Sequence, residues 1–69
     1  MKFNGIDLGS IELVKVSHGV FEFQGLSTDQ TKLDNAEVKA SLGAGSSFLA
    51  LDTSAVYMYH KESGSWYLL

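Results

Sequence analysis

The sequence predicts a single small all-β domain over residues 1–69, and three observations support this. Apolar and polar residues alternate through residues 11–24, the pattern of a half-buried hairpin. Residues 46–69 contain three segments rich in aromatic and β-branched residues, separated by polar turns. The chain is 45% hydrophobic with a net charge of -3, a composition that excludes disorder. We therefore expect small antiparallel sheets, arranged as a sandwich, from an N-terminal hairpin and a C-terminal three-stranded meander.

The N-terminal hairpin is expected to turn at His18 and Gly19. With these two residues as the loop, apolar and charged side chains both find partners across the strands, which lie about 5 Å apart. Gly19 supplies the positive φ of a tight turn, and either His18 shares that conformation or the loop is longer. Residues 1–8 are expected to hold a short edge strand that turns at residues 4–5. The expected hairpin pairs are Val16 with Phe21, Val14 with Phe23, and Lys15 with Glu22.

The C-terminal meander is expected from strands at residues 46–51, 55–60 and 65–69. A four-residue loop at residues 61–64 places two pairs that contain an aromatic residue across the last two strands, Tyr59 with Trp66 and Tyr57 with Leu68. Both faces of the meander are apolar, whereas an antiparallel sheet in water has one polar face. One face collects Leu49, Leu51 and Met58, and the other presents Phe48, Tyr57 and Tyr59.

The segment between the two β blocks, residues 27–45, carries a weaker pattern. Asp34 and Glu37 have the spacing of a capping box, with Asp34 as the N-cap of a short helix. A helix of this length is marginal without packing, so one or two helical turns and an extended loop both fit. Residues 27–30 are expected to form a polar surface turn.

Composition excludes several classes of partner. The five cations are lysines scattered singly, against eight carboxylates, so the chain lacks the basic patch of a nucleic-acid-binding protein. No apolar run approaches the ~20 residues of a membrane helix, and the first residues lack a signal-peptide pattern. We expect a protein made in the cytoplasm, with neither nucleic acid nor membrane as partner. Without cysteine, and with the marginal core of a short chain, oligomerisation is the expected means of stabilisation.

The residue pattern does not predict catalysis. His18 and His60 fall in predicted loops, without the companions of a metal site. The chain contains no Gly-x-Ser-x-Gly motif, and the glycine-rich residues 43–47 lack the lysine of a phosphate loop. The carboxylates Asp29, Asp34 and Glu37 lack calcium-loop spacing. We expect no enzyme activity, no cofactor and no metal.

The aromatic residues Tyr57, Tyr59, Trp66 and Tyr67 have two interpretations. They fill a small core and a subunit interface, where Tyr and Trp are enriched. Alternatively, Tyr57, Tyr59 and Trp66 form a platform that stacks on sugar rings, which would make the chain a carbohydrate-binding adhesin module for host glycans. Base stacking would require a positive groove, which the composition does not provide.

Three segments and one aromatic residue carry a resemblance to a known group of proteins: residues 25–29, residues 45–53, residues 56–59 and Trp66. This pattern of a glycine-serine bend, a strand, an Asp-Thr turn and a tyrosine strand resembles small virion structural proteins of tailed phages and prophages. The chain departs from the pattern of that group at two points. No proline follows Thr28-Asp29, and Ser54 occupies a position where a glycine is common.

The resemblance implies a non-enzymatic virion protein of the capsid decoration, head-fibre or tail-associated type. Such a protein is made in the bacterial host cytoplasm, acts through contacts with itself and other virion proteins, and is implied to be a trimer. Independently, the apolar C-terminal strand predicts an intersubunit contact. It is lined either by Val56, Met58, Trp66 and Leu68 or by Tyr57, Tyr59, Tyr67 and Leu69.

Overall fold

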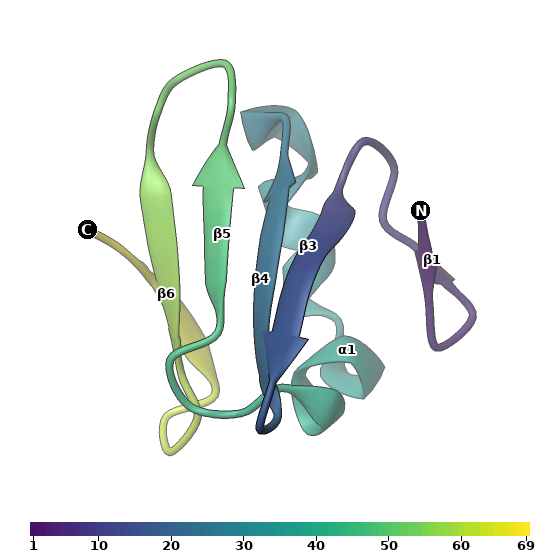
Figure 1. The fold of residues 1–69 in the computed structure, drawn as a ribbon, viewed down its shortest axis with the longest axis vertical. Coiled ribbons are helices and arrows are strands. Elements are labelled where there is room, and N and C mark those ends of the chain that lie inside the picture. Colours follow the sequence, from purple (N-terminus) through teal and green to yellow (C-terminus); the bar gives the residue numbers. More distant parts are fainter.

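The computed structural model describes all 69 residues and is mostly β, which confirms the predicted fold class. Figure 1 shows the strands side by side, with the helical segment behind them and the N-terminal hairpin at one side. A two-stranded sheet and a five-stranded sheet, in the order β3-β4-β5-β6-β7, make up the fold. The strands are β1 (Lys2–Phe3), β2 (Ile6–Asp7), β3 (Glu12–Ser17), β4 (Val20–Gly25), β5 (Ser47–Ala50), β6 (Val56–His60) and β7 (Ser65–Leu68).

The β3–β4 hairpin turns at the predicted two residues. His18 and Gly19 have φ of 53° and 79°, so His18 does share the left-handed conformation and the loop is no longer than two residues. The register confirms Lys15 opposite Glu22 and Val16 opposite Phe21.

The predicted pair of Val14 with Phe23 is wrong, because Leu13 lies opposite Phe23. The register shifts between Leu13 and Lys15, so Val14 is the extra residue of a β-bulge. The bulge keeps Leu13 and Val16 on the same side of the sheet as their phenylalanine partners. Apolar side chains therefore still lie opposite each other, although Leu13 takes the position expected for Val14.

The C-terminal meander has the predicted strands and pairings. Tyr59 lies opposite Trp66 and Tyr57 opposite Leu68, as the four-residue loop required. The hairpin and the meander, however, do not form separate sheets, because β4 and β5 pair in parallel. Gly25, the last residue of β4, also packs closely against the segment before β3, since a Cβ there would lie 2.9 Å from the Cα of Ile11.

The parallel junction requires a crossover, and the residues between β4 and β5 provide it with two helical segments. A 3-10 helix, η1 (Ser27–Asp34), replaces the polar turn expected at residues 27–30. It is followed by α1 (Ala36–Ser41), the short helix left open by the sequence. Its N-cap is Asn35 rather than Asp34, because the Asn35 Oδ1 accepts hydrogen bonds from the backbone N–H of Glu37 (2.8 Å) and Val38 (3.4 Å).

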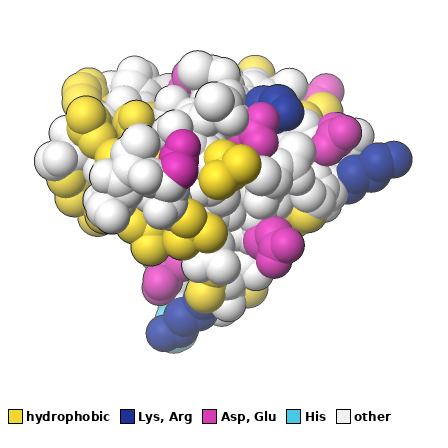
Figure 2. Space-filling view, turned by 90° about the horizontal axis from the view of Figure 1, so that it is seen from above, with side chains coloured by type: hydrophobic (Ala, Val, Ile, Leu, Met, Phe, Trp, Pro, Cys, Tyr) yellow, Lys and Arg dark blue, Asp and Glu magenta, His cyan; other side chains and the backbone are white.

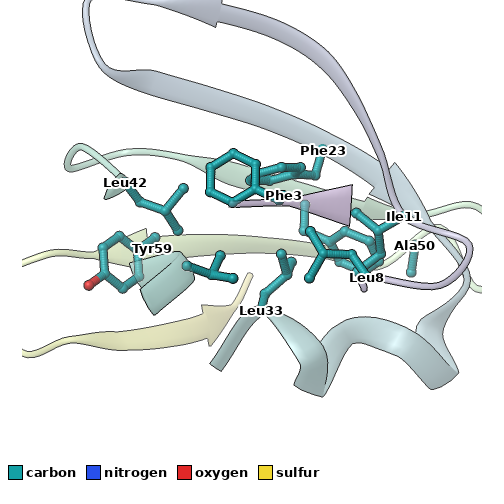
Figure 3. Close-up of a cluster of buried hydrophobic side chains, with 10 residues drawn as sticks. Phe3, Leu8, Ile11, Phe23, Leu33, Leu42, Ala50 and Tyr59 are labelled. Atoms are coloured by element: carbon teal, nitrogen blue, oxygen red, sulfur yellow. The ribbon is translucent and has the colours of Figure 1, made fainter. Parts of the chain in front are cut away.

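The core lies between one face of the five-stranded sheet and the layer formed by η1, α1 and the β1–β2 hairpin. Figure 3 shows Phe3 of β1 beside Phe23 of β4, and Leu33 of η1 pointing toward the sheet. The Phe3 ring meets those of Phe21 and Phe23 edge-on, at centroid distances of 5.4 and 5.7 Å. The buried hydrophobic residues are Phe3, Leu8, Ile11, Phe23, Leu33, Val38, Leu42, Phe48, Ala50 and Tyr59.

Ser46 is the single buried polar residue, and it links the end of the crossover to β4. Its hydroxyl donates to the Gly43 carbonyl (2.8 Å) and accepts from the Phe21 N–H (3.0 Å). Gly43 lies so close to the β3–β4 turn that a Cβ would meet the Gly19 carbonyl oxygen at 2.5 Å. The glycine-serine bend is thus a packed connection that starts β5.

Both helical segments are too short to span a membrane, and the structure contains no longer apolar helix.

Candidate interaction surface

The five-stranded sheet has one face that no other element covers, here called the open face. Its residues alternate with those of the core face, so Glu22 and Gln24 of β4 point away from the core while Phe23 points into it. The register then places Ser47, Met58 and Tyr67 in one row across β5, β6 and β7. Leu49 and Val56 form the next row.

The open face is apolar over β5–β7, where five side chains form what we call the apolar strip. Tyr67 is 52% exposed and Leu49 38%, whereas Val56 and Met58 are half-buried. Leu69 extends the second row, because its N–H donates to the Val56 carbonyl at 2.8 Å. The apolar strip consists of Leu49, Val56, Met58, Tyr67 and Leu69.

The same face is polar over β3 and β4. Lys15 lies opposite Glu22, and Glu12 lies opposite Gln24. The boundary runs between β4 and β5, where Gln24 is in register with Leu49. Figure 2 views one end of the molecule from above, and hydrophobic side chains gather there toward the side where Figure 1 places β6 and the C-terminus.

The structure regroups the residues predicted to line an intersubunit contact. Val56 and Met58 share a face with Tyr67 and Leu69, not with Trp66 and Leu68 as the first predicted set had it. The second predicted set was mixed in the same way, since residues directly opposite each other on paired strands share a face. The core-face group is Tyr57, Tyr59, Trp66 and Leu68.

The aromatic residues do not form a common exposed platform. Tyr59 is only 4% exposed, and the Trp66 ring packs against it at a centroid distance of 5.3 Å. The Trp66 Nε1–H donates to the Leu33 carbonyl at 3.1 Å, which ties β7 to η1. Tyr57 packs against Phe48 at 6.0 Å. Of the four aromatic residues, Tyr67 alone is exposed, and it lies on the opposite face.

The histidines lie at the surface, each beside a serine. The Nδ1 atom of His18 is 3.0 Å from the Ser17 hydroxyl, and that of His60 is 2.8 Å from the Ser63 hydroxyl. No three His, Asp or Glu side chains come together as a metal site would require. The structure also contains no detectable pocket.

Two carboxylates fasten η1 to its neighbours. Asp29 forms an ion pair with Lys32 at 2.7 Å and accepts hydrogen bonds from the Ser10 hydroxyl and N–H. The Lys32 hydrogen bond, followed by those from Ser10, holds the pKa of Asp29 well below its usual range. The same contact raises the pKa of Lys32. Asp29 therefore joins the loop before β3 to the first turn of η1.

Asp52, which follows β5, makes an equivalent contact at the same end of the sheet. It accepts from the Ser27 hydroxyl at 2.8 Å and from the Ser27 N–H at 2.9 Å. These hydrogen bonds lower the pKa of Asp52. Both carboxylates therefore act as structural links between the crossover and the sheet.

The two edge strands of the sheet differ in the same way as the two halves of the open face. β3 carries Glu12, Lys15 and the bulge at Val14, whereas β7 has no charged residue and no register shift. Sequence reasoning placed Leu49 and Met58 on the same face of the meander, which the register confirms, but left Leu49 out of the residues predicted to line an intersubunit contact. Comparison with known proteins finds no matching family model, no matching curated protein and no matching solved structure.

Proposed function

We propose that this protein is a non-enzymatic structural protein of a phage virion, of the capsid decoration, head-fibre or tail-associated type, that works through protein–protein contacts. The observation that supports it best is the apolar strip, which lies uncovered beside a polar half of the same sheet face. Contiguous exposed apolar surface usually marks an interaction site. Aromatic residues and methionine, both present in the strip, are enriched in protein interfaces.

The segments that carry the phage resemblance are those that build this surface. Residues 45–53 contain β5 with its flanking bends, and residues 56–59 lie in the adjacent β6. Leu49, Val56 and Met58 of these strands form the middle of the apolar strip. The resemblance and the surface therefore support the same proposal, a protein that assembles with itself and with other virion proteins.

The carbohydrate-binding alternative receives less support from the geometry. Tyr59 is buried, and Trp66 and Tyr57 pack on the core face, so the proposed platform residues cannot stack together on a sugar. Tyr67 is a single exposed ring, and a single ring does not make a platform. We do not propose glycan binding for this chain.

The test is the composition of the virion. Particles of the phage or prophage that encodes this chain are purified and examined by mass spectrometry, and we expect the chain at a fixed ratio to the major capsid or tail protein. Leu49→Lys places a charge in the centre of the apolar strip and should remove the chain from the particles. Gln24→Lys, in register with Leu49 on the polar half, is the matched control and should remain incorporated. Absence of the wild-type chain from particles would contradict the proposal.

A further inference from the structure

We infer that β7 pairs with the β7 strand of a second copy of this chain, antiparallel about a two-fold axis at Tyr67, so that two five-stranded sheets join edge to edge. The inference rests on the proposed function, which requires protein contacts on this side of the molecule, and it names one partner and one register. The surface involved is the backbone edge of β7, distinct from the side chains of the apolar strip.

The hydrogen-bond pattern shows which backbone groups of β7 are available. The Leu69 N–H donates to Val56, and the register pairs Tyr67 with Met58. Hydrogen-bonded and non-hydrogen-bonded pairs alternate along an antiparallel ladder. Trp66 and Leu68 therefore direct their N–H and C=O groups away from β6, toward the outer edge. β7 pairs with no strand other than β6, so this edge has no partner in the single chain.

The residues of β7 also lack the features that protect edge strands from pairing. Natural edges are blocked by charged side chains, proline, bulges or covering segments. The opposite edge, β3, carries Glu12, Lys15 and the bulge at Val14. β7 reads Ser-Trp-Tyr-Leu, with Leu68 61% exposed. One edge of the sheet is blocked and the other is open to a further strand.

A second copy fits this edge because β7 is complementary to itself. If Trp66 of one copy pairs with Leu68 of the other, the outward N–H and C=O groups of both residues are satisfied, and the two-fold axis repeats the pair. Tyr67 then faces Tyr67 of the second copy on the open face. The two apolar strips join into one continuous surface, and exposed Leu68 packs beside Trp66 of the other copy. No like charges meet, since β7 has none.

This two-fold arrangement takes the place of the threefold assembly that the phage resemblance implies. An isologous contact uses the same patch on both copies and closes at the dimer. Strand addition at a sheet edge derives its affinity from backbone hydrogen bonds and its specificity from the alternating side chains. Both contributions are present here in the outward groups of Trp66 and Leu68 and in the facing Tyr67 rings.

The mass of the full chain in solution tests the inference, by sedimentation equilibrium at micromolar concentrations. We expect a dimer. Leu68→Pro removes an N–H that does not bond β6 and should yield a folded monomer, with folding checked by circular dichroism. Val16→Pro is the matched control, because the two-residue turn places the Val16 N–H on the outer side of β3. It should remain dimeric, as should Leu49→Lys.

Other outcomes separate this inference from the proposed function. A monomeric or trimeric wild-type chain would overturn the two-fold pairing and leave the virion test unaffected. A dimer lost in Leu49→Lys but kept in Leu68→Pro would also overturn it, and would place self-contact on the apolar strip.

Amide hydrogen exchange of the wild-type chain gives an answer even if Leu68→Pro does not fold. We expect exchange of the Trp66 and Leu68 amides to slow by about tenfold or more as the dimer forms, because an edge N–H gains a partner. The Val16 amide should exchange fast at every concentration. Free exchange at Trp66 and Leu68 in the dimer would refute the pairing.

Discussion

The two faces of the five-stranded sheet are built from alternate residues of the same strands, yet they have different environments. On β5 and β6, Phe48 and Tyr59 are 0% and 4% exposed, while Leu49 of the other face is 38% exposed. The alternation of apolar residues on β5–β7 is therefore similar on both faces, and only one is covered. The cover comes from the crossover between β4 and β5, which carries η1 and α1, together with the β1–β2 hairpin.

The difference shows what determines whether a sheet face is covered or exposed in a chain this short. A parallel connection must pass over one face of the sheet, and its helices bury that face. Nothing remains in the chain to cover the other. On β3 and β4 the open face is polar and is solvated, as the Lys15–Glu22 pair illustrates. On β5–β7 it is apolar, and no other element of the chain covers it.

The largest loss of unfolding free energy is expected from substitution of a tyrosine on the core face, and a tyrosine on the open face provides the comparison. Tyr59→Ala removes a buried ring and should cost about 3–5 kcal/mol of unfolding free energy, close to the whole stability of a core this small. Tyr67→Ala removes a half-exposed ring of the open face and should cost the monomer about 1 kcal/mol. Urea denaturation at low protein concentration measures both. Equal losses would show that the open face is as well packed as the covered one.

A smaller effect is expected from the helix cap that supports the cover. Asn35→Ala removes the acceptor for the Glu37 and Val38 N–H groups and should cost about 1 kcal/mol. Asp34→Ala is the control and should change the unfolding free energy little, because Asp34 makes no capping contact. Denaturation midpoints of the two variants measure this. A greater loss of unfolding free energy for Asp34→Ala than for Asn35→Ala would mean that Asp34 is the N-cap, as the sequence predicted.

Acid pH should weaken the contacts of η1 more than the pairing of the meander strands. The folded-state pKa values of Asp29 and Asp52 lie below their unfolded values, so their stabilisation is present above pH ~4 and is lost as pH falls through the folded values. Both groups lie near the surface, where solvent screening limits the effect. Thermal melts from neutral to acid pH should show a declining Tm. The decline should be shallower in Asp29→Asn, and an unchanged slope would contradict the assignment.

The smallest effect is expected at a turn that belongs to neither face. Ser54 has φ of 60°, a left-handed conformation that glycine adopts without steric cost. Ser54→Gly should stabilise the chain by about 0.5 kcal/mol, since relief of strain exceeds the added unfolded-state entropy. Thr53→Gly, one position earlier, is the control and should destabilise. A loss of stability in Ser54→Gly would mean that the hydroxyl has an unrecognised role.

The local structure was largely predictable from the sequence, because it depends on neighbours along the chain. The turn at His18 and Gly19 and the Tyr59–Trp66 pairing follow from loop length and alternation. The bulge at Val14 was not predictable, since an inserted residue leaves the apolar pattern almost unchanged. The position of the cap was not predictable either, because Asp34 and Asn35 are adjacent and both residue types accept N-cap hydrogen bonds.

The long-range structure was not predictable in the same way. No local pattern states that β4 pairs with β5, because the two strands are separated by η1 and α1 and their side chains fit either a separate or a shared sheet. In the two residue sets predicted for an intersubunit contact, Trp66 and Tyr67 were each grouped with residues of the opposite sheet face. Once the Tyr59–Trp66 pairing is applied consistently, it separates the two faces correctly.

The parallel junction between β4 and β5 also has a consequence for the order in which the molecule folds. Hairpins such as β3–β4 and β6–β7 close within about 1–10 μs, because their contacts are near in sequence. The junction requires Gly25 to meet Ala50 across the whole crossover, so loop-closure entropy is lost before those contacts form. We expect the junction to limit the folding rate. Until it closes, β4 and β5 are additional unpaired strands, and aggregation competes most strongly at that stage.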